Sequence, residues 1–324
     1  MPGKNRYAML TVDTEALPRR AAEDHVQRLI WGRHGNASAG IREMCRIGDE
    51  VGARHVFFVD VCGAYAYGDQ VAEVVRWLDQ AGQDVQLHVH PEYLPEAFWV
   101  EHGFDYRPRF MNQFGLPKAE FTLRHFGKFI SDITNKPLVA FRAGSFRWNA
   151  ATLRALRSTG IALSFNNSMK AFLDGVCPYG EPTNAPFAWS NGIIEVPVSE
   201  RRPLPFHDGL GWERFSCPYS NTFFVPPWRM VWPFALGIDS SFLVLLMHSW
   251  SLLHWDENGH AHYRDDRRIE SYRRLVRKLS KDCDIITTGD FLDLHARGKI
   301  RTTHSVDMAL TELRIPDSRG KVIS

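Results

Sequence analysis

Two histidines stand one residue apart in the stretch DVQLHVHPEY, residues 84–93. Successive side chains of a strand point to opposite faces, so His88 and His90 would point the same way, with Cα atoms about 7 Å apart. Both imidazoles could then reach one metal ion. Catalytic zinc sites commonly combine two histidines with a carboxylate and leave a position for water. The stretch is therefore a candidate metal site, and ordinary strand histidines bonded to their neighbours are the alternative.

Two carboxylates near the N-terminus have the same spacing as the histidines. Asp13 and Glu15 directly follow a short apolar stretch, residues 7–12, that is typical of a first buried strand. Either residue could complete a site of two histidines and one carboxylate, and the sequence leaves open which of them is the ligand. Their presence favours a metal site over hydrogen-bonded strand histidines.

Two further polar residues come at the ends of predicted strands. His248 ends the most apolar strand, 242–247, and an imidazole placed there suits proton transfer, although a buried structural histidine would look the same. Arg142 follows the predicted strand 138–141. A buried arginine needs a carboxylate partner, and Asp13 is the natural candidate.

Strand-like and helix-like patterns alternate along most of the chain. The predicted strands lie at 7–12, 55–60, 84–89, 138–141, 161–165, 193–198, 242–247 and 284–288, and the predicted helices at 39–53, 69–78, 117–133, 149–159, 266–281 and 290–297. This order predicts βαβ units and a parallel sheet. Seven or eight units predict an irregular (β/α)7–8 barrel of the TIM type in one domain, residues 1–324, with an open doubly wound sheet as the alternative. In such a barrel the carboxyl ends of the strands meet at one mouth.

Residues 201–240 depart from this alternation because they are dense in proline and aromatic residues. We expect an irregular insertion there that packs its own small core and forms a cap. The tryptophans could also offer stacking faces to a substrate. Trp212 in this segment, Trp250 beyond it and Asn166, which follows the predicted strand 161–165, are the candidate substrate-binding residues.

A second pair of histidines with the same spacing serves as a comparison. His260 and His262 lie in WDENGHAHYRDD, a polar stretch without a strand pattern. We expect a solvated loop before the helix 266–281, and we do not predict a metal site there.

Composition and charge exclude several classes of protein. The chain has 324 residues, 44% of them hydrophobic and 23% charged, with a formal net charge of +2. These values are typical of a soluble globular protein and give no general case for binding nucleic acid. The apolar runs are too short to span a membrane. Five widely spaced cysteines fit a reducing compartment, and no apolar signal segment precedes the first predicted strand. We therefore expect a cytoplasmic protein.

The ordered set TVDTE, GQDVQLHVHP, FRAGSF, FNNS and LLMHS resembles the polysaccharide deacetylase superfamily, carbohydrate esterase family 4. The resemblance runs from about residue 9 to 250, and TTGDFLD at 287–293 looks like the closing strand and helix of that family. It implies an irregular (β/α) barrel that deacetylates N-acetyl sugars with one divalent metal ion, zinc or else cobalt, nickel or manganese. It further suggests a substrate that is a precursor of a surface polysaccharide such as O-antigen.

The resemblance also implies a role for each motif residue. The roles are catalytic base for Asp13, orientation of that base for Arg142, catalytic acid for His248, and metal ligand for Glu15, His88 and His90. Three features depart from the usual family pattern. Asp-Thr-Glu stands in place of adjacent aspartates, the two histidines lie two residues closer together, and Asn166 or Asn167 stands in place of an aspartate.

Two other functions remain open from the sequence. The barrel could hydrolyse a non-sugar amide, with or without a metal, because the ligand spacing differs from the family's. It could also be a catalytically inactive carbohydrate-binding protein that uses its aromatic segment to hold a sugar.

Overall fold

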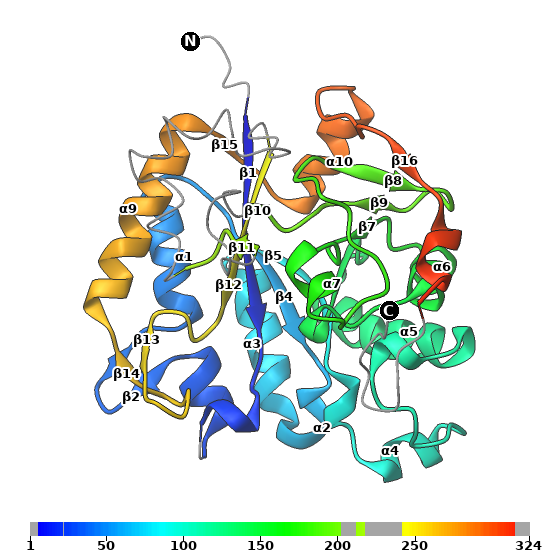
Figure 1. The fold of residues 1–324 in the computed structure, drawn as a ribbon. Coiled ribbons are helices and arrows are strands. Elements are labelled where there is room, and N and C mark those ends of the chain that lie inside the picture. The colour runs from blue at the N-terminus through cyan, green and yellow to red at the C-terminus, as the bar shows by residue number, and fades with distance from the viewer. Residues whose placement is uncertain (1–5, 22, 202–211, 218–241, 315–324) are drawn as a thin grey trace.

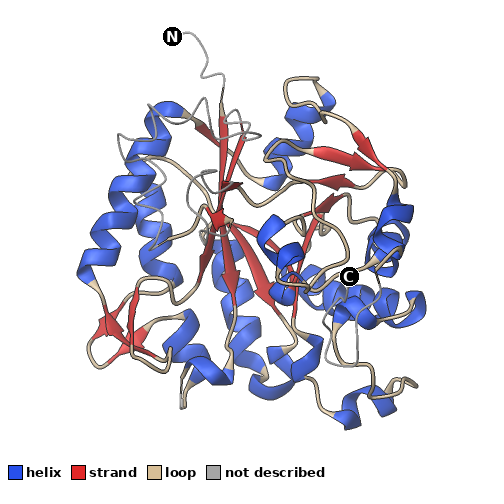
Figure 2. Ribbon diagram, viewed as in Figure 1, coloured by secondary structure: helices blue, strands red, loops and turns tan. Residues whose placement is uncertain are grey.

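The computed structural model describes residues 6–21, 23–201, 212–217 and 242–314. Its main feature is a ten-stranded sheet (Figures 1 and 2). The strands are β1 (Tyr7–Thr14), β4 (Val56–Asp60), β5 (Asp84–Val89), β6 (Ala140–Ala143), β7 (Leu163–Ser164), β8 (Phe187–Trp189), β9 (Ile194–Glu195), β12 (Phe242–His248), β15 (Asp284–Ile285) and β16 (Ser305–Val306). They follow the order β12-β1-β4-β5-β6-β7-β9-β8-β16, and β15 also pairs with β1.

The sheet curls into an irregular barrel. Every neighbouring pair from β12 through β1, β4, β5, β6 and β7 to β9 is parallel, whereas β8 runs antiparallel to β9. The chain beyond β9 then reaches β12. Ser199 N donates to Val244 O at 3.2 Å, and Leu246 N donates to Phe215 O at 2.8 Å. The structure therefore confirms the predicted irregular (β/α) barrel.

Helices cover the outside of the sheet and follow the predicted alternation closely. The α-helices are α1 (Ile41–Asp49), α2 (Gly63–Tyr67), α3 (Asp69–Gln80), α4 (Glu96–Glu101), α5 (Leu116–Thr134), α6 (Ala150–Thr159), α7 (Met169–Leu173), α9 (Asp266–Asp282) and α10 (Thr288–Ala296). Each of the longer helices buries one apolar stripe, and in α3 this stripe is Val71, Val74, Val75 and Leu78. Such stripes are what attach amphipathic helices to a sheet.

Alternation along the strands divides the apolar residues between two cores. One core fills the barrel and includes Met9, Phe58, Ala140, Phe165 and Val244. The larger core lies between the sheet and the helices and takes the strand residues that point outward. Polar residues that share the inward face with the interior core are thereby brought to the mouth of the barrel.

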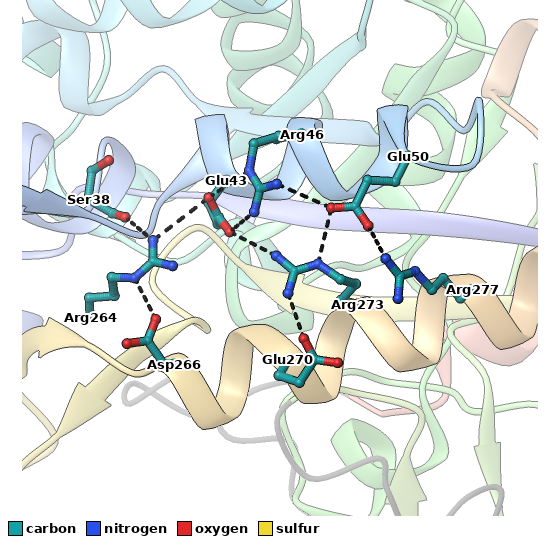
Figure 3. Close-up of polar contacts among 9 residues, drawn as sticks. All are labelled: Ser38, Glu43, Arg46, Glu50, Arg264, Asp266, Glu270, Arg273 and Arg277. Atoms are coloured by element: carbon teal, nitrogen blue, oxygen red, sulfur yellow. Dashed lines mark hydrogen bonds and ion pairs between the residues drawn. The ribbon is translucent and has the colours of Figure 1, made fainter.

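A network of charged side chains joins α9 to α1, which lie side by side (Figures 1 and 3). The carboxylate of Glu50, just beyond α1, contacts Arg46 of the same turn at 3.2 Å, and Arg273 and Arg277 of α9 at 3.1 and 2.9 Å. Glu43 of α1 pairs with Arg46 at 2.6 Å. The network ties the last long helix to the first one.

Several segments differ from what the sequence predicts. Strands β7, β9 and β15 are shorter than the predicted 161–165, 193–198 and 284–288. Strand β6 covers Ala140–Ala143 rather than 138–141, and it therefore includes Arg142. Ala140 belongs to the core inside the barrel and Phe141 to the core outside it. The predicted loop around His260 and His262 is wrong in part. Residues Ala261–Arg264 form β14, which pairs with β13 (Leu253–Trp255) in a hairpin. Ala261 is buried, whereas His262 and Tyr263 are both exposed, so this short strand shows no alternating pattern.

Three smaller features complete the description. Short antiparallel pairs are formed by β2 (Arg33–His34) with β3 (Ala37–Ser38), and by β10 (Glu200–Arg201) with β11 (Glu213–Arg214). Most of the predicted cap at 201–240 lies outside the described residues. Within the described part of the chain, no helix combines the length and the apolar character needed to cross a bilayer.

Candidate metal centre

Both histidines of the HVH stretch point at one carboxylate oxygen. His88 Nε2 lies 2.7 Å and His90 Nε2 lies 2.9 Å from Oε1 of Glu15. His88 sits in β5, His90 directly follows it, and Glu15 directly follows β1. All three side chains are almost fully buried. The predicted grouping of these residues is therefore formed, with Glu15 rather than Asp13 between the two histidines.

The hydrogen bonds behind the imidazoles show that the three groups fit a cation. His88 Nδ1 lies 2.7 Å from the backbone oxygen of Arg142, and His90 Nδ1 lies 2.9 Å from Oε1 of Glu92. Both contacts are to acceptors, so each Nδ1 carries the proton and donates it. In neutral rings the two Nε2 lone pairs then face a carboxylate oxygen. Three electron-rich atoms in one buried place are stabilised by a shared cation, and a divalent metal suits this set of donors.

The electrostatics of the site agree with this interpretation. Burial alone would raise the pKa of Glu15, but the neighbouring His90 and His88 hold it well below its ordinary value. Burial alone would lower the pKa of His90, yet the Glu92 and Glu15 carboxylates hold it well above the ordinary value. The pKa of His88 is raised in the same way by Asp13 and Glu15. Without a metal, protons are the cations that the site would retain.

Asp13 lies beside this group and is held by Arg142. Arg142 Nη1 donates to Asp13 Oδ1 at 2.6 Å, and its Nη2 donates to Thr11 Oγ1 at 2.9 Å. The guanidinium carbon lies 4.3 Å from the ring centre of Phe58. The predicted pairing of Asp13 with Arg142 is confirmed, and it explains how a fully buried arginine is tolerated.

His248 completes the mouth. Ligand-type atoms of Asp13, Glu15 and His248 all lie within 4.8 Å of one another, as expected from the register that places Asp13 opposite His248. The His248 ring stacks on Trp250, with centroids 4.9 Å apart and planes at 22°. Burial lowers the pKa of His248, an effect that Glu15 and Asp13 partly oppose. A cavity of about 230 Å³ opens here, lined in part by Asp13, Glu15, His90, His248 and Trp250.

The other two candidate substrate-binding residues are placed elsewhere. Asn166 is fully buried. Its side chain accepts from Ala143 N at 2.7 Å and donates to Ser164 Oγ at 2.9 Å, which fixes the backbone next to Arg142. Trp212 is half-buried and directly precedes β11. Neither residue is among the described side chains that line the cavity.

Two carboxylates of the site were missed in the sequence. Asp60 ends β4, and its Oδ1 accepts from the backbone N–H of both His90 and Cys62 at 3.1 Å. The rule that polar residues at strand ends converge would have found it, since Asp60 closes the predicted strand 55–60. Glu92 had no such signal, because it lies beyond the end of the strand, in the short 3-10 helix Pro91–Tyr93.

The turn after β6 also borders the cavity. Ser145 and Phe146 both line it, and both have positive φ, 53° and 57°. The backbone of a residue other than glycine is strained at such φ values, and strain of this kind concentrates at functional sites. Gly144 precedes them, and a Cβ there would lie 2.6 Å from His90 Nδ1. The glycine thus lets the turn approach the candidate ligand.

Comparisons with known proteins identify the fold. No protein-family model matches the chain, and no curated protein matches its sequence. Among solved structures, one described as a polysaccharide deacetylase from Mycobacterium smegmatis matches with a TM-score of 0.56 and 15% identity, over 93% of this chain and 94% of that one. Puue allantoinase matches with a TM-score of 0.51 and 12% identity, over 93% and 94% of the two chains.

A third solved structure shows how widely this barrel is used. The 4-alpha-glucanotransferase from Thermococcus litoralis matches 93% of this chain but only 40% of its own length, with a TM-score of 0.55 and 11% identity. The three proteins carry names of different activities. Likeness at these identities therefore establishes the barrel, and the chemistry must be inferred from the site itself.

Proposed function

We propose that this protein is a metal-dependent hydrolase that removes an N-acyl group, most simply acetyl, from a sugar or a sugar-containing precursor. One observation carries the proposal. Two histidines and a glutamate converge on one point at the carboxyl ends of the strands, with an arginine-bound aspartate and a histidine beside them. The ordered motifs that resemble the polysaccharide deacetylases support the same activity. The barrel shared with the Mycobacterium smegmatis protein is consistent with it.

Glu15, His88 and His90 are the residues that would hold the ion. A divalent ion bound there would acidify a water and polarise the acyl carbonyl. Asp13 is placed to take a proton from the attacking water, because Arg142 fixes the orientation of its carboxylate at 2.6 Å. Arg142 therefore has two roles. Its side chain orients Asp13, and its backbone oxygen fixes the ring of His88.

His248 is placed to give a proton to the departing nitrogen. An amine leaves far more readily when it is protonated, and His248 faces the same cavity as Asp13. Ser145 and Phe146 line the same cavity, and a backbone N–H that reached the acyl oxygen there would stabilise a developing oxyanion by a few kcal/mol. The proposed acid and base therefore face one small volume.

The test combines metal content with turnover. We would measure bound metal by mass spectrometry and amine release from N-acetylated sugars, in the wild type and in the His88→Ala, His90→Ala double variant. We expect about one equivalent of metal in the wild type, and loss of both metal and activity in the variant. The His260→Ala, His262→Ala variant is a matched control, since it removes a histidine pair of the same spacing from a partly exposed hairpin.

Three outcomes would contradict the proposal in different ways. A wild type that retains no metal after reconstitution would exclude metal-dependent hydrolysis. Activity that survives thorough chelation would favour an amidase that works without a metal. Metal binding with turnover only of non-sugar amides would retain the centre and change the substrate class. A role in O-antigen synthesis, zinc as the native ion and a cytoplasmic location stay predictions of the sequence, which does not name the sugar.

A further inference from the structure

The imidazole of His248 is held differently from those of the two candidate ligands. His88 and His90 each donate from Nδ1 to an acceptor, at 2.7 and 2.9 Å. Among the described residues, no hydrogen bond reaches either ring nitrogen of His248, and its contact with Ser251 Oγ at 2.9 Å comes from the backbone N–H. The ring torsion of a histidine has only broad preferences of its own. Packing, rather than hydrogen bonding, must therefore set the orientation of this ring.

Trp250 supplies the flat surface against which the His248 ring lies. The two rings are close to parallel, with planes at 22° and centroids 4.9 Å apart, an arrangement in which aromatic rings attract each other. His248 ends β12, and Trp250 follows after one residue. The backbone between them is also fixed, because Ser251 N donates to the backbone oxygen of His248 at 2.9 Å. The stack is therefore part of a short, well-bonded turn at the mouth of the barrel.

Trp250 is itself held in place. Trp255 Nε1 donates to its backbone oxygen at 3.2 Å. The guanidinium carbon of Arg20 lies 6.0 Å from the ring centre of Trp250 and 5.5 Å from that of Trp255, and Arg20 Nη1 donates to the backbone oxygen of Gly259 at 3.2 Å. The indole thus packs against groups that are fixed in turn, and it can act as a rigid support.

The burial of Trp250 argues against a role as a stacking face for substrate. The exposed fraction of this residue is 2%, whereas a platform for a sugar needs an open ring face. Its ring already has an imidazole and a guanidinium against it. Trp250 borders the cavity, but at this burial it presents very little surface to a ligand. These contacts favour a role through His248 over the substrate contact expected from the sequence.

We infer that Trp250 is a positioning residue for the candidate acid, because its indole holds the imidazole of His248 toward the cavity, where a proton can pass to the departing nitrogen. This inference rests on the proposed function. A general acid must lie within hydrogen-bond reach of the atom that it protonates. A ring free to turn would meet this condition only part of the time. Turnover, and not substrate or metal binding, therefore depends on Trp250.

The first experiment compares two substitutions of Trp250 in the metal-loaded protein. Trp250→Leu keeps apolar bulk and removes the flat surface, whereas Trp250→Phe keeps an aromatic ring. With amine release from an N-acetylated sugar as the assay, we expect Trp250→Leu to lower kcat by about 10–100-fold and to leave KM and metal content unchanged. Trp250→Phe should recover most of this loss.

Trp31→Leu is the matched control for this comparison. Trp31 is as buried as Trp250, and the guanidinium carbon of Arg42 lies 4.8 Å from its ring centre. It is not among the described residues that line the cavity. Trp31→Leu should therefore leave kcat unchanged in the folded protein.

A second experiment asks whether Trp250 acts through His248. In the His248→Ala background, Trp250→Leu should lower kcat no further, because the group that it positions is already gone. The NMR signal of the His248 ring gives a readout that needs no substrate. The ring current of the adjacent indole should shift this signal in the wild type, and the shift should be lost in Trp250→Leu.

The outcomes separate this inference from the proposed function. A KM that rises while kcat stays constant would show that Trp250 contacts substrate, and an equal loss of kcat with and without His248 would show that it acts elsewhere; either result overturns the inference and leaves the hydrolase in place. If no N-acetylated sugar is hydrolysed, the proposed function fails. The NMR signal then decides: a lost shift in Trp250→Leu supports the positioning of His248, and an unchanged signal overturns it. If Trp250→Leu does not fold, magnetisation transfer between the two rings in the wild type tests their contact, and its absence overturns the inference.

Discussion

At the scale of single residues, the groups proposed to react are each fixed by a second group behind them. Arg142 serves two of them at once. Its backbone oxygen accepts from His88 Nδ1 at 2.7 Å, and its side chain donates to Asp13 at 2.6 Å. His90 is fixed by Glu92 through its side chain and by Asp60 through its backbone. Geometry of this kind makes separate roles testable by separate substitutions.

Replacing His248 should affect turnover far more than metal binding. The ring of His248 stacks on Trp250 and faces the cavity, outside the group formed by Glu15, His88 and His90. In His248→Ala we expect kcat to fall by about 10²–10⁴, the range for loss of a general acid, with metal content unchanged. Amine-release kinetics and metal analysis check this. A parallel loss of metal and activity would show that His248 is a ligand instead.

Replacing Glu92 should weaken the metal site without removing a ligand. Glu92 accepts the Nδ1 proton of His90 at 2.9 Å and so makes Nε2 a better electron donor. For Glu92→Ala we expect metal affinity to fall by about 10–100-fold, measured by competition with a chelator. Glu101→Ala, an exposed carboxylate at the end of α4, is the matched control. Unchanged metal affinity in Glu92→Ala would show that Glu92 stabilises its own segment and does not support metal binding.

At the scale of elements, the α1–α9 network offers a measurable contribution to stability. Glu50 contacts three arginines, two of them on α9 (Figure 3). A network of ion pairs contributes more to stability than an isolated surface pair does. Glu50→Gln should therefore lower the free energy of unfolding by about 1 kcal/mol at low salt, and by less in high salt. Urea unfolding at two ionic strengths checks this. An effect that does not depend on salt would mean that packing rather than charge is lost.

Glu195 links strand β9 to the segment after β7. It accepts from the backbone N–H groups of Asn166 and Asn167 at 2.6 and 2.7 Å, and from Trp189 Nε1 at 2.9 Å. Burial raises the pKa of Glu195 to about 7 although these hydrogen bonds favour the carboxylate. The folded state therefore keeps a proton that the unfolded chain loses at lower pH, so stability falls as pH rises from the ordinary glutamate range to about 7.

The substitution Glu195→Gln isolates this dependence. The free energy of unfolding of the wild type, minus that of Glu195→Gln, should fall by on the order of 3 kcal/mol between about pH 4 and pH 8. Urea unfolding across this range measures it, and the difference cancels the other titrating groups. A difference that stays constant with pH would show that folding does not shift the pKa of Glu195.

At the scale of the whole molecule, the barrel could be predicted because alternating strand and helix patterns are long and regular over the first half of the chain. The stripe of α3 is an example, since all four of its predicted apolar residues are buried. Shorter elements escaped this reasoning. Strands β8 and β16 span three and two residues, too few for a period. The closure through Ser199 and Phe215 depends on backbone bonds that no side-chain pattern encodes.

The candidate site could be predicted in part for the same reason. Asp13, His88 and His248 occupy strand ends, so the barrel itself brings them together. The positions of Glu92, Ser145 and Phe146 are set by the segments that follow the strands. A loop residue reaches the site through the path of its backbone, and composition does not specify that path. Sequence reasoning therefore found what the strands carry and missed what the connections add.

Among the residues that the structure describes, the two edges of β12 have unequal backbone pairing. Along one edge the strand pairs with β1 from Tyr7↔Phe242 to Asp13↔His248. On the other edge it meets Ser199, Phe215 and Ser216 through single bonds and an isolated bridge. Amide protons report such differences, because local opening lets deuterium in. The N–H groups of Ser199 and Leu246 should therefore exchange well before those that bind β12 to β1. Because His248 ends this strand, transient separation along that edge would loosen the candidate acid while Asp13 and Arg142 stay in place.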